Sequence, residues 1–314
     1  MTGNAPLRLL LGPQRPDVTI AQALARSGIG DAPIGVISAA WQEAEGDIDD
    51  IRQAVARPLT DLHLYHRAET LFAANPALHE AYRQRQDRLK AQQRLYRLRL
   101  RQLMIAARAT LTADGERAML AAERRHAISQ LRALDQHHLR QVDKINGRYD
   151  DRISSESNPQ LAEQIAEVKE AISLVDTVLI TGGNIVVLLN RLRLFGLDVL
   201  LRDKNIVGWS AGAMVLSERI VLFHERLPQG RRDAEVLGKG LGMLPGVVLL
   251  PDAKQRLRMK DELRVGLFDR RFSPAICMTL ENGSWLLYEG QTLIDSESSK
   301  RMTRGGKFKR VRSA

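Results

Sequence analysis

The hydrophobic pattern changes character three times along this 314-residue chain. Residues 1–76 contain three short apolar runs, "LRLLLG", "APIGVISAA" and "DLHLYH", with helix-like stretches between the first two. Two more runs, "DTVLITGGN" and "NIVGWSAG", follow within residues 157–299. Alternation of short apolar runs with helical stretches is typical of a mostly parallel sheet with helices on both faces. We therefore predict an α/β core that residues 1–76 and 157–299 build together.

Residues 77–156 interrupt this core with the pattern of a long helical hairpin. No proline occurs between residues 78 and 146, and the good helix formers Arg, Gln, Leu and Ala dominate. Apolar residues recur there in three- and four-residue steps, as in the narrow seam of a coiled coil: Leu89, Tyr96, Leu100, Leu103, Ala107 and Leu111, then Ala127, Leu131, Leu134, Val142 and Ile145. A turn signal, "TADGE", separates the two series. We predict two antiparallel helices of about 30 residues each, which form an arm about 45 Å long.

Charge is concentrated in this arm and in the end of the chain. The formal net charge is +10; residues 77–151 hold 16 Lys and Arg against 9 Asp and Glu, and residues 300–314 hold seven basic residues and no acidic one. We expect residues 300–314 to be a disordered basic tail. "LPGVVLLP", "AICMTLENGSWLLYEG" and "QTLIDSES", which precede the tail, read as closing strands with a hairpin around residues 281–283.

The basic arm and tail suit nucleic acid or another acidic surface electrostatically. The first helix of the arm has only Tyr82 and Tyr96 as aromatic residues, which is poor material for stacking bases. A helical protein partner or self-association is therefore at least as well supported, and a solvated hairpin without any ligand also stays open.

The composition also limits where the protein works and what it binds. No apolar run approaches the roughly 18 to 20 residues that cross a bilayer, and the N-terminus lacks the features of a signal peptide, so we expect a cytoplasmic protein without membrane contact. The single cysteine, Cys277, excludes an internal disulfide and gives no metal-ligand spacing. We expect Cys277 to be a packed strand residue, and we expect no metal and no cofactor.

One short motif points to chemistry. Gly208-Trp209-Ser210-Ala211-Gly212 has the form G-x-S-x-G and follows a predicted strand. Glycines around a serine at such a position let the chain turn sharply from strand to helix, which exposes the hydroxyl and directs backbone N–H groups at a developing oxyanion. Small residues at a strand-to-helix turn can also be there for close packing alone. The five-residue pattern therefore identifies a nucleophile only together with the surrounding sequence.

That context resembles a known family. "TGGN" at residues 181–184, "GWSAGA" at 208–213 and "GKGLGMLPGVVLLP" at 238–251 are similar to segments of the peptidase S51 family, which includes dipeptidase E and cyanophycinase and has a fold similar to class I glutamine amidotransferases. The resemblance is weak over about residues 7–62 and firmer over about residues 176–290. The arm and the basic tail lie outside the family core.

The resemblance implies roles for several residues. Ser210 matches the nucleophile of the family. Gly182 and Gly183 match the loop that helps to form the oxyanion hole, with the N–H of Ala211 as the other donor. Glu225, fifteen positions after the serine, matches the acidic member of the dipeptidase triad.

The general base departs from the family pattern. Family members carry a histidine just after the strand that follows "GLGLLP", whereas "LLPDAKQRL" places Asp252 there. An aspartate, with an ordinary pKa of about 3.9 against about 6.5 for histidine, is a much weaker base. His224 could reach the serine from another direction, and a neutral Lys254 could form a serine–lysine dyad. Loss of the base costs on the order of 10⁴ to 10⁶ in rate.

Two hypotheses from different classes follow. The first is a serine hydrolase for a small peptide or an aspartyl-type amide, with Ser210 as nucleophile and Glu225 and Asp252 as the acid–base pair. The second is a catalytically inactive protein that kept the fold and whose arm and tail bind a partner. His63 and His66, near the end of an early strand, are expected to be surface residues.

Overall fold

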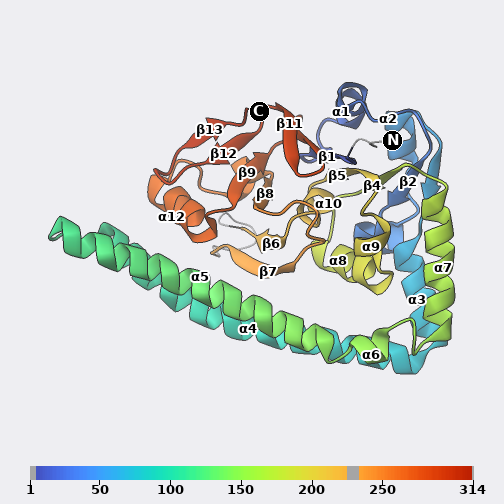
Figure 1. The fold of residues 1–314 in the computed structure, drawn as a ribbon, viewed down its shortest axis with the longest axis horizontal. Helices are drawn as coiled ribbons and strands as arrows, with labels where there is room; N and C mark the ends of the chain where they lie inside the picture. Colours follow the sequence, from blue (N-terminus) through green and yellow to red (C-terminus); the bar gives the residue numbers. More distant parts are fainter. Residues whose placement is uncertain (1–4, 225–232, 313–314) are drawn as a thin grey trace.

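The computed structural model describes residues 5–224 and 233–312, and its largest sheet confirms the predicted α/β core (Figure 1). This sheet has seven strands in the order β11-β10-β1-β5-β4-β2-β3. The five strands from β1 to β3 are mutually parallel, and β10 and β11 add an antiparallel edge. The strands are β1 (Leu7–Leu11), β2 (Ile34–Ile37), β3 (Leu59–Asp61), β4 (Thr177–Ile180), β5 (Asn205–Trp209), β10 (Trp285–Glu289) and β11 (Thr292–Glu297).

Each face of the sheet packs against its own set of helices. Side chains alternate along β1, so Leu9 and Leu11 pack on one face and Leu10 on the other. The first face is covered by α1 (Ile20–Ser27) and α2 (Asp49–Val55). The second is covered by α3 (Leu64–Ala74), α7 (Pro159–Ser173), α8 (Ile185–Leu194) and α10 (Ala211–Met214), with α9 (Leu197–Leu200) and the 3₁₀ helix η1 (Ala39–Ala44) beside them. Strands buried on both faces account for the continuous apolar runs in the sequence.

A second sheet corrects the expected hairpin around residues 281–283. This sheet has the order β13-β12-β9-β8, whereas β10 belongs to the large sheet, so the chain turns at 281–283 and passes from one sheet to the other. The hairpin in this region is instead β10–β11. The second sheet consists of β8 (Val247–Pro251), β9 (Ile276–Leu280), β12 (Lys300–Met302) and β13 (Phe308–Arg310). Around it lie the helices α11 (Ala253–Arg256) and α12 (Glu262–Phe272) and the separate strand pair of β6 (Arg219–Leu222) and β7 (Glu235–Lys239).

Cys277 is fully buried in β9, as expected, and burial raises the pKa of its thiol.

The second sheet also shows that the expectation of a disordered tail was wrong for residues 300–310. Lys300 and Arg301 pair with β9 and are exposed, while Met302 is buried against the core. β13 is the outer strand of this sheet. Charged side chains are common on such outer strands because they prevent pairing with other chains. The basic residues therefore belong to an ordered edge of the protein.

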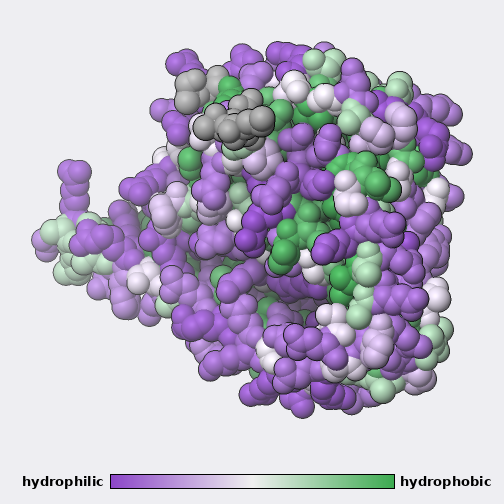
Figure 2. Space-filling view, turned by 45° about the vertical axis from the view of Figure 1, so that its right-hand side comes forward, coloured by the Kyte–Doolittle hydropathy of each residue, from purple (hydrophilic) through white to green (hydrophobic). Residues whose placement is uncertain are grey.

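The inserted segment forms the predicted antiparallel hairpin. It consists of α4 (Pro76–Thr112) and α5 (Arg117–Gly147), which lie side by side in Figure 1, and the short α6 (Asp150–Ile153) follows. At 1.5 Å per residue, the 37 residues of α4 span about 55 Å, somewhat more than expected. The turn end of the arm projects beyond the body, and Figure 2 shows its surface as largely hydrophilic.

The middle of the arm is fixed to the body by a buried polar network. The Arg271 guanidinium of α12 donates to both carboxylate oxygens of Asp135 in α5, at 2.6 and 2.7 Å. Tyr96 of α4 donates to Asp135 at 2.7 Å and accepts from the N–H of Val236 in β7 at 3.1 Å. Removing one member of such a buried pair typically lowers the free energy of unfolding by about 3–5 kcal/mol, so these contacts hold the arm in one position.

Within the described residues, every helix is too short or too polar to cross a membrane.

Candidate active site

Ser210 occupies the sharp turn that the motif predicted. It joins β5 to α10 with φ 49° and ψ −113°, a backbone conformation that non-glycine residues rarely adopt. Two hydrogen bonds hold the turn: the Ser210 N–H donates to the Leu11 carbonyl at 3.1 Å, and the Ser210 carbonyl accepts from the Met214 N–H at 3.0 Å. In the described parts of the chain, the Ser210 hydroxyl has no hydrogen-bond partner. Strain of this kind is typical of functional positions.

The two motif glycines are required by close packing of the backbone. A Cβ atom at Gly212 would lie 2.0 Å from the carbonyl oxygen of Ile180 in the neighbouring strand β4. A Cβ atom at Gly208 would lie 2.7 Å from the carbonyl oxygen of Gly212. The first turn of α10 therefore rests directly on β4 and β5, which fixes where the serine points.

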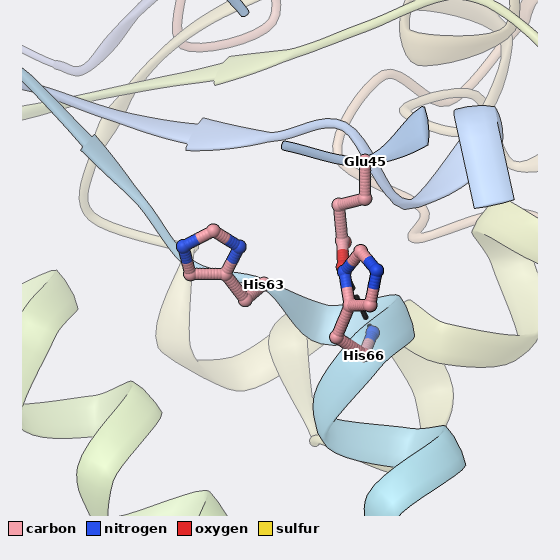
Figure 3. Close-up of side chains that lie close together, drawn as sticks. All are labelled: Glu45, His63 and His66. Atoms are coloured by element: carbon pink, nitrogen blue, oxygen red, sulfur yellow. Dashed lines mark hydrogen bonds and ion pairs between the residues drawn. The ribbon is translucent and has the colours of Figure 1, made fainter. Parts of the chain in front are cut away.

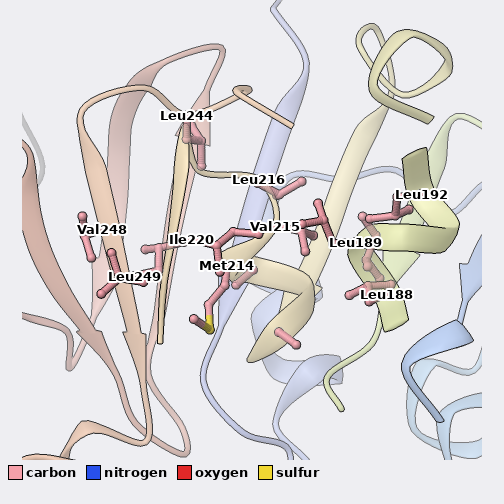
Figure 4. Packing of buried hydrophobic residues seen from close by; sticks show 14 of the residues in the cluster. Leu188, Leu189, Leu192, Met214, Val215, Leu216, Ile220, Leu244, Val248 and Leu249 are labelled. Carbon is pink, nitrogen blue, oxygen red and sulfur yellow. The ribbon is translucent and has the colours of Figure 1, made fainter. Parts of the chain in front are cut away.

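A buried apolar layer supports the turn from behind (Figure 4). Met214, Val215 and Leu216, at the end of α10 and just beyond it, lie between side chains of α8 and β8 in this view. All three are less than 7% exposed. The labelled neighbours are Leu188, Leu189 and Leu192 of α8, Ile220 of β6, Leu244, and Val248 and Leu249 of β8. The position of Ser210 is thus set by the main core.

The "TGGN" loop lies against the serine, as the resemblance implied. A Cβ atom at Gly182 would lie 3.0 Å from the Ser210 Cβ. Gly183 has φ +130° and approaches Ala40 so closely that a Cβ atom would lie 2.8 Å from its carbonyl oxygen. The Asn184 side chain caps α8 by accepting from two backbone N–H groups. At the start of α10, the Ala211 N–H is one of the helix N–H groups that have no acceptor within the helix.

Ser210 opens into a cavity of about 1360 Å³ whose walls come from distant parts of the sequence. One wall follows β1, another is formed by η1 and α2, a third is the "TGGN" loop, and the rest comes from the ends of β6 and β8. The lining residues that bear on chemistry are Arg15, Trp41, Asp47, Asp50, Gly182, Gly183, Ser210, Ala211, His224 and Arg256. Both signs of charge are present, since Arg15 and Arg256 face the same cavity as Asp47 and Asp50.

The candidate bases differ in their relation to this cavity. His224, two residues after the end of β6, borders it together with Ser210. Asp252 follows β8 with φ 58°, and its carboxylate lies 3.5 Å from Arg256 Nε; neither Asp252 nor the exposed Lys254 is among the described residues that line the cavity. Glu225 lies outside the described residues. The catalytic role of Asp252 therefore stays a prediction, and the structure gives this residue a contact with a cavity arginine.

Potential metal ligands gather elsewhere. Among the described residues, Glu45, His63 and His66 each place a ligand atom within 4.8 Å of those of the other two, and none of them lines the cavity. The sequence pattern did not indicate this group, because Glu45 lies 18 positions before His63. The signal that could have found it is the H-x-x-H spacing of His63 and His66 at the start of a helix.

Comparison with known proteins agrees with the motifs. The sequence model of peptidase family S51 matches residues 153–295, somewhat under half of the chain. Among solved structures, the chain is similar to a peptidase from an acI-B1 Actinobacterium (13% identity, 96% of this chain and 92% of that chain, TM-score 0.44). It is also similar to a candidate peptidase E from Listeria monocytogenes EGD-e (12% identity, 95% and 100% coverage, TM-score 0.44). No curated protein matches. The segment that holds Ser210, its glycine loop and Asp252 thus matches peptidase family S51, as the sequence motifs predicted.

Proposed function

We propose that the protein is a serine hydrolase that cleaves a short peptide or an aspartyl-type amide, with Ser210 as the nucleophile. The observation that carries this proposal is the strained Ser210 turn, which opens into a large cavity beside a glycine loop. A serine that served only packing would not need a positive φ at the mouth of a cavity. The match to peptidase family S51 over the same segment supports this assignment.

The surroundings of Ser210 suit acyl transfer. Attack of the Ser210 oxygen on the scissile carbonyl forms an acyl bond, breaks the amide bond, and places negative charge on the carbonyl oxygen in between. The N–H of Ala211 and the loop of Gly182 and Gly183 are the donors that we assign to this oxygen. Losing one such donor typically costs about 10²- to 10³-fold in rate. Water then hydrolyses the acyl bond and restores the serine.

We assign the general base to His224. Among the described residues that line the cavity with Ser210, His224 supplies the imidazole, whereas the Asp252 carboxylate contacts Arg256. In this assignment Asp252 positions Arg256, whose guanidinium also lies 6.0 Å from the centre of the Phe223 ring at the cavity wall. Arg256 would then hold a carboxylate of the substrate.

The charges of the cavity favour a small zwitterionic substrate. Arg15 and Arg256 can bind a carboxylate, and Asp47 and Asp50 can bind an amino group. A short peptide carries both groups at its ends, and an aspartyl residue adds a second carboxylate. We therefore propose short peptides with an acidic residue as the substrate class.

Labelling with a fluorophosphonate tests the proposal, since this electrophile reacts with activated serine hydroxyls. The wild-type protein is expected to be labelled and Ser210→Ala is not. Ser173→Ala, which changes an exposed serine on α7, is the matched control and should be labelled like the wild type. Labelling of Ser210→Ala at the wild-type level would contradict the proposal.

The arm supports a second candidate function, self-association. Leu95, Leu98 and Ile105 of α4 are 58%, 66% and 54% exposed, although all three are large and apolar. Steps of three and seven residues place them on one face of the helix. We propose that this stripe binds the same stripe of a second chain.

Sedimentation analysis tests this second function. The mass of the wild type is expected to rise from one chain to two with concentration, because burial of the stripe removes apolar area from water. Leu98→Gln should abolish the rise, while Leu174→Gln, which changes an exposed leucine outside the arm, should not. A single-chain mass for the wild type at every concentration would exclude the proposal.

A further inference from the structure

Three potential metal ligands, Glu45, His63 and His66, meet at the carboxyl ends of strands β2 and β3, and Asp61 contacts His63 beside them. Asp61 is the last residue of β3, and His63 and His66 lie at the start of α3. Glu45 follows η1, the element that continues from β2. The carboxyl edge of a parallel sheet is where α/β proteins usually bind ligands. The group is separate from the Ser210 cavity, because none of its members lines that cavity.

The ligand atoms are already close to one another. His66 Nδ1 lies 3.0 Å from Glu45 Oε2, and His63 Nδ1 lies 3.6 Å from Asp61 Oδ2. Figure 3 shows the His63 ring with one nitrogen on the side that faces Glu45 and His66. Four ligands at about 2.0–2.2 Å from a tetrahedral ion are about 3.3–3.6 Å apart. Glu45, His63 and His66 offer ligand atoms that all lie within 4.8 Å of one another, and Asp61 adjoins this group at His63, so turning of the two rings would bring ligand atoms closer together.

Helix capping accounts for one part of this arrangement. The Glu45 side chain is completely buried, and its carboxylate accepts from the backbone N–H groups of Tyr65 and His66 at 2.8 and 2.9 Å. These bonds cap the first turn of α3. They also fix the orientation of the carboxylate, as hydrogen bonds around a metal ligand commonly do.

Helix capping does not explain the buried carboxylate of Asp61. Asp61 Oδ1 accepts from the His63 N–H at 3.0 Å, whereas Asp61 Oδ2 is buried and, within the described residues, has no hydrogen-bond partner. The Asp61 side chain is only 7% exposed. A buried carboxylate with an unpaired oxygen, next to a histidine that also lies near the buried Glu45, forms a place where a cation would be stabilised.

We propose that Glu45, Asp61, His63 and His66 bind a divalent transition metal ion of the zinc class. Two imidazoles with two carboxylates suit zinc and its neighbours, whereas magnesium and calcium prefer oxygen ligands alone. His63 and His66 are each about 50% exposed, which leaves a path for the ion and room for the rings to turn. The bound ion would join η1 to α3 and so brace the cavity wall that carries Trp41.

Titration calorimetry with zinc chloride alone, on the full chain after treatment with a chelator, tests the site. The wild type is expected to bind one equivalent. His63→Ala and His66→Ala should each weaken binding by at least about 100-fold, since loss even of a supporting residue costs about 10- to 100-fold. Both side chains are half-exposed, so the variants should fold, and their circular dichroism spectra check this.

Two control variants make the result specific to this site. His126→Ala, an exposed histidine on α5, should bind one equivalent like the wild type. Ser210→Ala should also bind normally, which separates this proposal from the hydrolase. Asp61→Asn keeps the shape of the side chain and should weaken binding. Failure of the wild type to bind one equivalent, or wild-type affinity in both His63→Ala and His66→Ala, would overturn the proposal.

Discussion

Ser210 shows how far a local motif predicts the backbone of a candidate site. The turn from β5 to α10 follows from G-x-S-x-G, because glycines on both sides of the serine leave room for the backbone to turn sharply. The reason for the second glycine, Gly212, was not visible in the sequence. It lies in the 2.0 Å approach that a Cβ atom at Gly212 would make to Ile180, a residue 32 positions earlier on another strand.

A candidate for the proposed general base was harder to choose from the sequence, for a physical reason. The sequence comparison aligned Asp252 with the family histidine, but the position of a residue along the chain does not say which way its side chain points. The structure pairs Asp252 with Arg256 and places His224 at the cavity. Sequence alone could propose both residues and could not choose between them.

Substitution of the two residues separates their roles. His224→Gln is expected to lower kcat/KM by on the order of 10⁴-fold or more, because the nucleophile loses its proton acceptor. Asp252→Asn should raise KM and leave kcat within about tenfold, because Arg256 loses its partner but the reaction keeps its base. The measurement is the rate of hydrolysis of short acidic peptides between pH 5 and 9.

The pH profile of the wild type adds a second test of the base. Only a neutral imidazole accepts a proton, and histidine ordinarily has a pKa of about 6.5, so activity should rise with pH through the neutral range. A carboxylate base, with an ordinary pKa of about 3.9, would already be deprotonated at pH 5, so activity would change little through the neutral range. Activity that survives His224→Gln but is lost in Asp252→Asn would assign the base to Asp252.

At the scale of elements, the helical arm was predictable and the end of the chain was not. The arm repeats its apolar period over many turns, and that repetition identifies a helical hairpin without knowledge of its neighbours. β12 and β13 have three residues each, too few for a period, and their charge suggested disorder. They form because β9 offers a strand to pair with and because Met302 and Val311 are buried there.

The attachment of the arm predicts a dependence of stability on pH. His138 of α5 is 1% exposed and stacks on Tyr96, with ring centroids 4.1 Å apart. Burial lowers the pKa of His138, an effect that outweighs the opposite influence of Asp135. Below about pH 6.5 the unfolded chain therefore binds a proton that the folded chain resists, and stability falls as the pH falls.

Thermal unfolding of His138→Leu tests this dependence. Between pH 7.5 and 5.5 the wild type should lose about 1 kcal/mol more stability than His138→Leu, which has no imidazole to protonate. His126→Leu, a change at an exposed histidine of the same helix, should keep the wild-type dependence. Equal losses in the wild type and His138→Leu would show that another group governs the acid response.

At the scale of the whole molecule, the order of the strands in the sheet could not be predicted from the sequence pattern. Alternating patterns predicted an α/β core, and the parallel strands β1, β5, β4, β2 and β3 confirm it. The order of the large sheet brings together residues that follow β1, β2, β4 and β5, and residues that follow β6 and β8 of the other two sheets complete the cavity. The same order brings Glu45 to Asp61 and the two histidines. The strand order brings the residues of each candidate site together. The sequence could therefore point to some of these residues one at a time, but it could not show that they form a group.

The most direct test of the central claim is to find which residue a fluorophosphonate modifies between about pH 4 and 9. Intact mass spectrometry should show one adduct per wild-type chain, and digestion should place it on the peptide that contains Ser210. Activated serines react because a base removes their proton, so an unactivated Ser210 would stay unmodified. A single adduct on Ser210 is the predicted result; no adduct at any pH in this range, or an adduct on another serine, would contradict the claim.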